Sequence, residues 1–438
     1  MKLLVNSLIG GFTGSFLWFA ITFWAYLETK SVVVTSVVSG FFGITTALFG
    51  LFFGTYVDRH RKHQAMVVSA ILALVCLVGS AVAYRGIGRS EIRLSNPVLW
   101  VLIAFVMMGT VAGNLRSLAL ATCVSLLVPE AARDRANGLV GTVSGVSFTF
   151  TSVLSGLVVG RLGMGWAIVI AFVCTLVSLL HLLTIRFVES TPQRSPNEPE
   201  KRIDLRGALD AIRAVPGLRG LVAFAALNNL LGGVYMALLD AYGLELVSVE
   251  SWGLLWGVLS CGFIVGGLIV ARFGLGSRPM RILVFGNALS WLVASVFSVG
   301  ASIVGVGVGL FIWLTTMPII EAAEQTVLQR TVPFEVQGRV FGFAQMIENA
   351  AAPIVALSIG PFAEGVVIPF MTKGSGPDVF GSLFGTGIVA GIGLCFTAAG
   401  VLGMVLTLVV RLSKPYRLLD RASVLRSDEP KNKSIMAT

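Results

Sequence analysis

The feature that most constrains this chain is a series of long apolar runs that recur along almost its whole length. A helix needs about 20 apolar residues to cross the hydrocarbon core of a bilayer. Lipid offers the backbone no hydrogen-bond partner, so runs of this length must be helical. The composition agrees, since 55% of the 438 residues are hydrophobic and only 12% are charged, far from the range of soluble domains. The sequence therefore predicts an all-α membrane protein.

Polar or glycine-rich breaks divide these runs into twelve expected spanning helices, six on each side of a polar stretch. The first six are expected at residues 4–27, 31–56, 64–84, 98–127, 139–160 and 166–185. The second six are expected at residues 219–243, 250–271, 280–297, 303–329, 340–365 and 387–411. This pattern predicts an N-terminal six-helix bundle over 1–186, a cytoplasmic linker over 187–218, a C-terminal six-helix bundle over 219–411 and a cytoplasmic tail over 412–438.

The linker contains a candidate amphipathic helix. Leu205, Leu209, Ile212 and Val215 recur at roughly helical spacing among charged residues. This pattern is typical of a helix that lies on a surface. A plain solvated connector is the alternative.

Lys and Arg residues indicate the orientation, because basic loops stay on the cytoplasmic side of a membrane. With both termini in the cytoplasm, the cytoplasmic segments hold 25 of the 32 basic residues and the outer loops hold 6. Residues 85–97 and 366–386 then face outward. The net charge of +10 reflects this topology, and no basic stretch interleaved with aromatic residues suggests nucleic-acid binding. We expect a monomer in the inner membrane.

An internal repeat relates the two halves at an offset of 204 residues. The pattern V-P-x5-R-x2-G occurs twice, each time after one long apolar run and before another. Its members are Pro129, Arg135 and Gly138 in the first half and Pro333, Arg339 and Gly342 in the second. Two related six-helix halves are the architecture of transporters that rock two bundles about a central site.

A charged motif follows the second expected span. Residues 54–62 read GTYVDRHRK, which resembles the major facilitator signature G-x3-D-R-x-R-(R/K) between helices 2 and 3. The two repeat loops are similar to those of the drug and proton antiporter branch, which includes macrolide, tetracycline and siderophore exporters. The resemblance covers about residues 4–411. It implies a secondary transporter with the major facilitator fold.

The charges of this motif suit a conformational latch made of Gly54, Asp58, Arg59, Arg61 and Lys62. Gly54 permits close helix approach. Asp58 can pair with Arg59, Arg61 or the N-terminus of a neighbouring helix. A purely topological role explains Arg61 and Lys62 but leaves Asp58 unexplained. The equivalent loop of the second half has no aspartate and keeps only basic residues, such as Arg272, Arg278 and Arg281.

Ionisable residues inside spans are costly and are functional candidates for that reason. Arg116 and Glu321 fall at equal depth in the two halves under the repeat. Glu324 and Gln325 share the helix face of Glu321 by their spacing, and Glu348 lies about two turns into the eleventh span. The resemblance implies that helices 1, 4, 7 and 10 border the cavity. The polar residues expected to face it are Asn114, Arg116, Asn228, Asn229, Glu321 and Glu324.

These positions lead us to expect proton coupling. Glu321 would pair with Arg116 in one conformation, and Glu324 or Glu348 would be free to take up a proton in another. Two alternatives stay open. Arg116 could reach the inner surface by snorkelling, and Glu324 and Glu348 could serve structural hydrogen bonds.

Enzyme classes find no support in the motifs. The chain has neither a G-x4-G-K-(S/T) phosphate loop nor an H-E-x-x-H pair, and its five cysteines fall in apolar runs. We therefore expect no catalysis, cofactor or metal. The favoured function is a proton-coupled exporter of amphipathic small molecules, whether multidrug, macrolide-like or siderophore-like, that works by alternating access. A lipid or metabolite carrier of the same fold is the alternative, and a non-transporting membrane sensor is a more remote one.

Overall fold

The described part of the chain is helical throughout its regular elements. The computed structural model describes residues 2–87, 92–127, 147–185, 205–332 and 334–425. Ten helices in these ranges are long and apolar enough to cross a membrane. With α1 (Lys2–Thr29) and a helix over residues 147–161, they make up the expected twelve. The prediction of an all-α membrane fold is confirmed.

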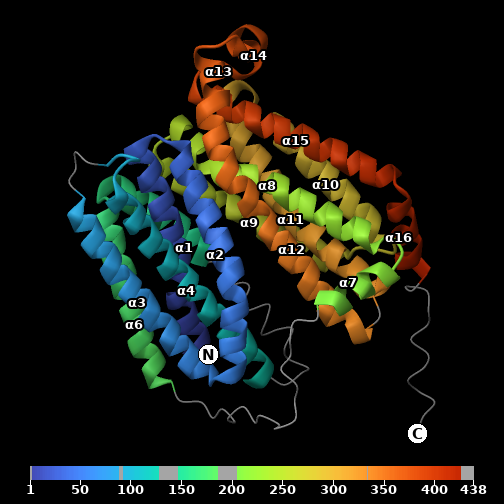
Figure 1. Ribbon diagram of the computed structural model, residues 1–438, viewed down its shortest axis with the longest axis horizontal. Helices are drawn as coiled ribbons and strands as arrows, with labels where there is room; N and C mark the ends of the chain where they lie inside the picture. Colours follow the sequence, from blue (N-terminus) through green and yellow to red (C-terminus); the bar gives the residue numbers. More distant parts are fainter. Residues whose placement is uncertain (1, 88–91, 128–146, 186–204, 333, 426–438) are drawn as a thin grey trace.

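Two bundles lie side by side (Figure 1). Besides α1 and the helix over 147–161, the N-terminal bundle contains α2 (Val32–Arg59), α3 (Lys62–Gly86), α4 (Pro97–Leu127) and α6 (Met164–Thr184). The C-terminal bundle contains α8 (Leu218–Leu246), α9 (Val249–Phe273), α10 (Pro279–Val296), α11 (Ile303–Thr331), α12 (Phe334–Phe362) and α15 (Ile388–Leu412). A short 3-10 turn, η1 (Val299–Ala301), joins α10 to α11.

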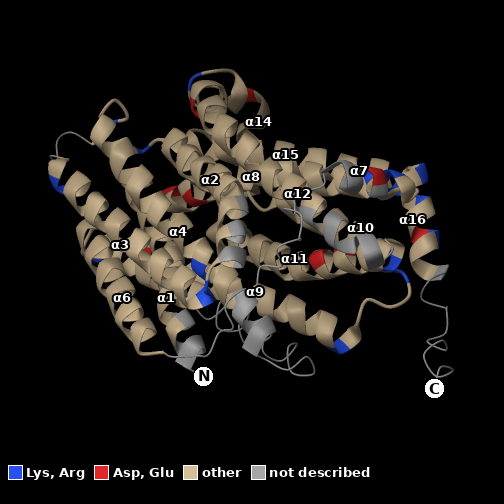
Figure 2. Cartoon of the chain, turned by 60° about the horizontal axis from the view of Figure 1, so that its bottom comes forward, with Lys and Arg blue, Asp and Glu red and all other residues tan. Residues whose placement is uncertain are grey.

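Local chemistry explains why the helices begin close to their expected positions. The hydroxyl of Ser31 accepts a hydrogen bond from the Val33 amide at the start of α2, and Ser248 does the same for Ser251 at the start of α9. Each bond satisfies one of the amides that the first helical turn leaves without a partner. Few charged residues lie inside the helices; among them are the buried Arg116 of α4 and the acidic residues of α11, which Figure 2 draws in red.

The outer segment 366–386 folds into a small helical cap. It is built from the π-helical turn η2 (Ala363–Val367), α13 (Ile368–Thr372) and α14 (Gly376–Phe384). Met371 and Phe384 are buried with Ala390 at the start of α15. In Figure 1 the cap projects beyond the bundles. We call this end of the molecule the cap end.

The two bundles share one hydrophobic core near the cap end. Phe19 of α1 packs against Trp256 of α9 with ring centroids 5.7 Å apart, and Asp240 of α8 accepts a hydrogen bond of 3.0 Å from the Trp256 indole. Gly156 and Gly253 let two backbones approach, since a Cβ atom on Gly253 would lie 3.0 Å from the Gly156 Cα. This contact ties the bundles together at the cap end.

Polar bonds close the same end across the bundle interface. Glu245 at the end of α8 accepts hydrogen bonds from Lys30 Nζ and the Tyr26 hydroxyl, both at 3.1 Å. Glu364 accepts from the Ser31 hydroxyl at 2.5 Å and from the backbone amide two residues later at 3.2 Å. Two carboxylates of the C-terminal bundle therefore hold the α1–α2 turn of the N-terminal bundle.

At the opposite end the bundles have separate cores. One small cluster lies within the N-terminal bundle and includes Val57, Met66 and Leu115. Another lies within the C-terminal bundle and includes Leu283 and Leu328. The helices α2 and α12 also part toward this end. They touch at Gly40 and Leu357 near the cap end, whereas Leu48 and Phe52, farther along α2, are 59% and 69% exposed.

Two further helices lie at this opposite end, which we call the linker end. α7 (Leu205–Ala214) occupies the place of the expected amphipathic helix, and its Ile212 is buried in the C-terminal core. Within the expected tail, Lys414–Leu425 forms a helix, α16, whose Tyr416 and Leu419 fill the same core. Asp420 of α16 lies 4.0 Å from Arg278, in the α9–α10 loop that lacks its own aspartate, and 3.8 Å from Arg281 in the first turn of α10.

Candidate functional site

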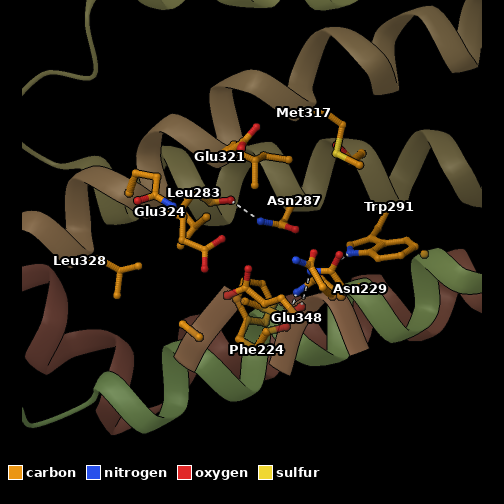
Figure 3. A pocket seen from close by; sticks show the side chains of 18 of the residues that line it. Phe224, Asn229, Leu283, Asn287, Trp291, Met317, Glu321, Glu324, Leu328 and Glu348 are labelled. Atoms are coloured by element: carbon orange, nitrogen blue, oxygen red, sulfur yellow. Dashed lines mark hydrogen bonds between the residues drawn. The ribbon is translucent and has the colours of Figure 1, made fainter. Parts of the chain in front are cut away.

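A cavity of about 490 Å³ opens within the C-terminal bundle. Its walls come from α8, α10, α11 and α12, with Phe263 from α9. The volume falls within the usual range of small-molecule sites. Figure 3 shows the side chains that surround it.

Three carboxylates line the cavity. Glu321 and Glu324 stand one turn apart on α11, and Glu348 comes from α12. Glu348 lies across the cavity from the α11 pair in Figure 3. Gln325, beside Glu324, also lines the wall. The site is thus acidic on two of its faces.

Amide side chains give the remaining polar wall. The Nδ2 of Asn228 donates to the carbonyl of Phe224 at 2.7 Å, and that of Asn229 donates to Ala225 at 3.1 Å. The Nδ2 of Asn287 on α10 donates to its own helix, to Leu283, at 2.9 Å. Each of these amides therefore gives one of its two N–H donors to a helix carbonyl.

Aromatic side chains form the apolar wall at one end. The Trp291 indole donates to Asn228 Oδ1 at 2.5 Å. Trp313 stands edge-on to Tyr235 with ring centroids 4.6 Å apart, and Tyr235 in turn stacks on Phe396 at 4.9 Å. These contacts fix the two tryptophans at the cavity edge. In Figure 3 Trp291 and Met317 lie at one end of the site and Glu324 and Leu328 at the other.

Most of the residues expected in the substrate or proton pathway line this cavity. They are Asn228, Asn229, Glu321, Glu324, Gln325 and Glu348. Sequence reasoning missed the contribution of α10, where Asn287 and Trp291 face the cavity. The signal was present, because Asn287 is an amide inside an otherwise apolar span.

Arg116 and Asn114 lie elsewhere. Arg116 is buried in the N-terminal bundle, where its guanidinium donates to Ser178 Oγ at 2.9 Å and to the Asn6 carbonyl at 2.6 Å, and also bonds the Asn6 side chain. Asn114 donates to Thr46 Oγ1 at 3.3 Å. In this conformation Arg116 is therefore bonded within its own bundle and not to Glu321.

The expected latch and repeat loops are described only in part. Gly54, Asp58 and Arg59 belong to the last turns of α2, but the surroundings of Gly54 and the side chains of Asp58 and Arg59 lie outside the described part of the chain. Arg61 is the N-cap residue of α3, and the buried Lys62 donates from Nζ to the Val57 carbonyl at 2.6 Å. Of the repeat residues, Pro129, Arg135, Gly138 and Pro333 lie outside the described part; Arg339 and Gly342 belong to α12, but their surroundings lie outside it too.

The described residues offer no cluster of three or more His, Cys, Asp or Glu side chains that could hold a metal ion. The chemistry of the cavity is therefore that of carboxylates, amides and aromatic rings. Such a lining can bind a small amphipathic molecule and can exchange protons with it or with water.

Known proteins show where this architecture belongs. A family model described as Major Facilitator Superfamily matches residues 3–356. Macrolide efflux protein A of Streptococcus pyogenes is 22% identical over 373 residues, which cover 81% of this chain and 86% of that protein. Enterobactin exporter EntS of Salmonella typhimurium is 24% identical over 297 residues, which cover 66% of this chain and 67% of that protein.

Solved structures agree on the fold. A bacterial homologue of the human lysosomal transporter Spinster, in an inward-facing and unoccupied conformation, has a TM-score of 0.63 at 15% identity and covers 97% of this chain and 98% of its own. A bacterial homologue of the iron transporter ferroportin, in an inward-facing state, has a TM-score of 0.66 at 16% identity, with coverage of 94% and 98%. The chain therefore belongs to the major facilitator superfamily.

Proposed function

We propose that this multi-pass membrane protein is a secondary active exporter of amphipathic small molecules that works by alternating access in the inner membrane. The observation that carries the proposal is the cavity in the C-terminal bundle, whose lining combines three carboxylates with two tryptophans. The lining suits a molecule with both polar and apolar parts. Export is favoured because the relatives described above are named as an efflux protein and an exporter.

The bundle contacts support an inward-facing assignment for this conformation. The bundles share a core and polar bonds at the cap end, and they have separate cores at the linker end. The positive-inside pattern places the linker end in the cytoplasm. A rocking motion that breaks the cap-end bonds and closes the linker end would expose the cavity outward. The latch around Asp58 would act at that closure.

Proton coupling is proposed through the cavity carboxylates. Three acidic side chains in one cavity repel one another when all are ionised, which favours a proton shared among them. Arg116 is not needed for this step in the present conformation, since Asn6 and Ser178 already accept its donors. A pairing of Arg116 with Glu321 stays a prediction for the opposite conformation.

The proposal predicts that Glu324→Gln and Glu348→Gln each weaken coupling between substrate and proton by about tenfold or more, because each removes an exchangeable carboxyl. Purified full-length protein in liposomes with a trapped pH dye would report proton movement when substrate is added. Asp378→Asn, on the exposed surface of α14, is the matched control. Glu321→Gln would show whether all three carboxylates take part. Normal coupling in every glutamine variant would contradict the proposal.

The same liposomes separate the alternatives. A lipid carrier would move labelled phospholipid between leaflets without added small molecule, and a non-transporting sensor would give no flux at all. An exporter of the proposed kind moves an added amphiphile against its gradient when a proton gradient is imposed. Absence of amphiphile transport in these vesicles would refute the proposed function.

A further inference from the structure

We infer that the transported molecule is an organic cation, an amine or quaternary centre joined to an apolar body. The inference deepens the proposed transport function and rests on it. Its starting point is the charge of the cavity wall. The charged residues that line it are Glu321, Glu324 and Glu348, and no Lys, Arg or His is among the described lining residues.

The amides add neutral hydrogen-bonding groups, including acceptor oxygens, to this wall. Asn229 and Asn287 each donate one of the two Nδ2 N–H groups to a carbonyl of their own helix, which leaves one N–H and the Oδ1 acceptor on each amide. Their Oδ1 atoms therefore remain as acceptors at the cavity wall. A ligand that donates hydrogen bonds or carries positive charge matches such a wall, whereas an anion meets acceptors on several sides.

The aromatic end provides the second half of the recognition. Trp291 and Trp313 line the cavity together with Phe224 and Phe341. Aromatic faces accommodate apolar groups and also attract cations through the ring quadrupole. Trp291 is held in place by its bond to Asn228. The arrangement seats the cationic centre near Glu324 and Glu348 and the apolar body toward Trp291 and Met317 (Figure 3).

The arginine inside a membrane span does not alter the negative charge of the cavity wall. An anion carrier would need a basic group at the cavity, and Arg116 is the arginine inside a span. Its guanidinium is engaged by Asn6 and Ser178 in the other bundle. Gly10 of α1 lies directly against it, so the backbone of α1 covers the side chain. The geometry therefore favours a cation over an anionic ligand such as a catecholate.

Two probes of nearly equal size and opposite charge test the inference. Tetraphenylphosphonium and tetraphenylborate share four phenyl groups and differ in the sign of the central charge. Binding to purified full-length protein in nanodiscs, with empty nanodiscs subtracted, is measured by equilibrium dialysis. We expect saturable binding of the phosphonium ion and none of the borate.

Variants connect that binding to the carboxylates. Glu324→Gln and Glu348→Gln should each raise the Kd for the phosphonium ion by about tenfold, because a bound cation displaces the proton that the carboxyls share, and each variant then leaves one negative charge fewer beside it. Asp378→Asn on the cap should leave the Kd unchanged. Trp291→Phe should keep more affinity than Trp291→Leu, since it keeps an aromatic face. Size-exclusion chromatography checks that each variant is folded. Equal binding of both ions, or phosphonium binding that survives in both glutamine variants, would overturn the inference.

Liposome flux distinguishes this inference from the proposed function. A panel of cationic, neutral and anionic amphiphiles is added to vesicles that report proton movement. Proton movement caused by the cations alone supports the inference. If anions or neutral amphiphiles drive the flux instead, the protein is still a transporter and the cation inference is wrong. If no amphiphile gives flux above empty vesicles, the transport proposal itself fails, and the cation inference with it.

Discussion

A single arginine shows how a charge can be accommodated inside a span without serving the cavity. The guanidinium of Arg116 is surrounded by acceptors from α1 and α6, namely the Asn6 carbonyl and side chain and the Ser178 hydroxyl. These bonds replace much of the hydration that the charge loses. Arg116 thus connects three helices of the N-terminal bundle through its hydrogen bonds.

This role predicts that Arg116→Gln lowers stability rather than affinity. The change leaves buried acceptors on Asn6 and Ser178 without their donor, which costs about 1–3 kcal/mol. The thermal midpoint of the solubilised protein should fall, while the Kd of the folded fraction for a bound amphiphile should stay within about twofold of the parent. Ser178→Ala, which removes one of the acceptors, is a milder companion variant. An affinity loss as large as that of Glu324→Gln would place Arg116 in the site after all.

The sequence predicted which residues would lie together where depth and helix face agreed, and the role of these residues in a substrate or proton pathway stays a prediction. Glu321, Glu324 and Gln325 share one face by spacing alone, and the structure brings them to the same cavity. The repeat gave Arg116 and Glu321 the same depth, but depth says nothing about direction around a helix. One residue along an α-helix turns the side chain by about 100°. Only the packing of α4 against α1 and α6 decides which way Arg116 points.

At the scale of elements, α16 supplies a carboxylate to the α9–α10 loop, which has no aspartate of its own. The α9–α10 loop has no aspartate at the position of the signature motif, and Asp420 of α16 brings a carboxylate to Arg278 and Arg281. Arg330 at the end of α11 donates to the Ser423 carbonyl of the same helix at 3.4 Å. α16 therefore connects the ends of two spanning helices.

We expect Asp420→Ala to loosen the α9–α10 loop. The ion pairs are partly exposed, so their loss should cost no more than about 1 kcal/mol, but the loop would lose its anchor. Hydrogen exchange over residues 274–282 should become faster, with little change in α8. Asp210→Ala removes the exposed pair between Asp210 and Arg213 and serves as the control. Unchanged exchange at the loop would show that apolar contacts alone hold α16.

Elements were predicted well because hydropathy marks them directly. The expected span 303–329 became α11 (Ile303–Thr331), and 387–411 became α15 (Ile388–Leu412). The sequence did not reveal α16 or the helices of the cap. These short helices are held by contacts with distant parts of the chain, such as Leu419 with Gly217, and local pattern does not encode such contacts.

At the scale of the whole molecule, the cap-end contact decides which side is closed. Duplicated halves predict two bundles, but not which end of them is in contact, because the same sequence must support both conformations. The backbones of Gly156 and Gly253 touch in this conformation, in which the cap end is closed. A side chain there would act as a wedge.

Gly253→Leu should therefore hold the cap end open. A Cβ atom at this position would lie 2.6 Å from the Ser152 carbonyl oxygen, so the closed packing cannot form. A cysteine at Ser36, which is fully buried and whose hydroxyl has no hydrogen-bond partner, reports the opening in a background without other cysteines. Its labelling by an impermeant maleimide from outside should rise at least tenfold. Gly267→Leu, where a Cβ meets nothing within 4 Å, is the control, and equal labelling in both variants would refute the wedge.

The position of α16 also bears on how the protein is made. Tyr416 and Leu419 complete a core whose other members, such as Leu218 and Leu221, enter the membrane with the seventh span. During translation those residues are inserted long before their last packing partner leaves the ribosome. Until α16 is synthesised, the C-terminal bundle lies in the bilayer with this core incomplete. A nascent chain released just before α16 would hold every spanning helix and still present an open apolar surface to chaperones and quality-control proteases.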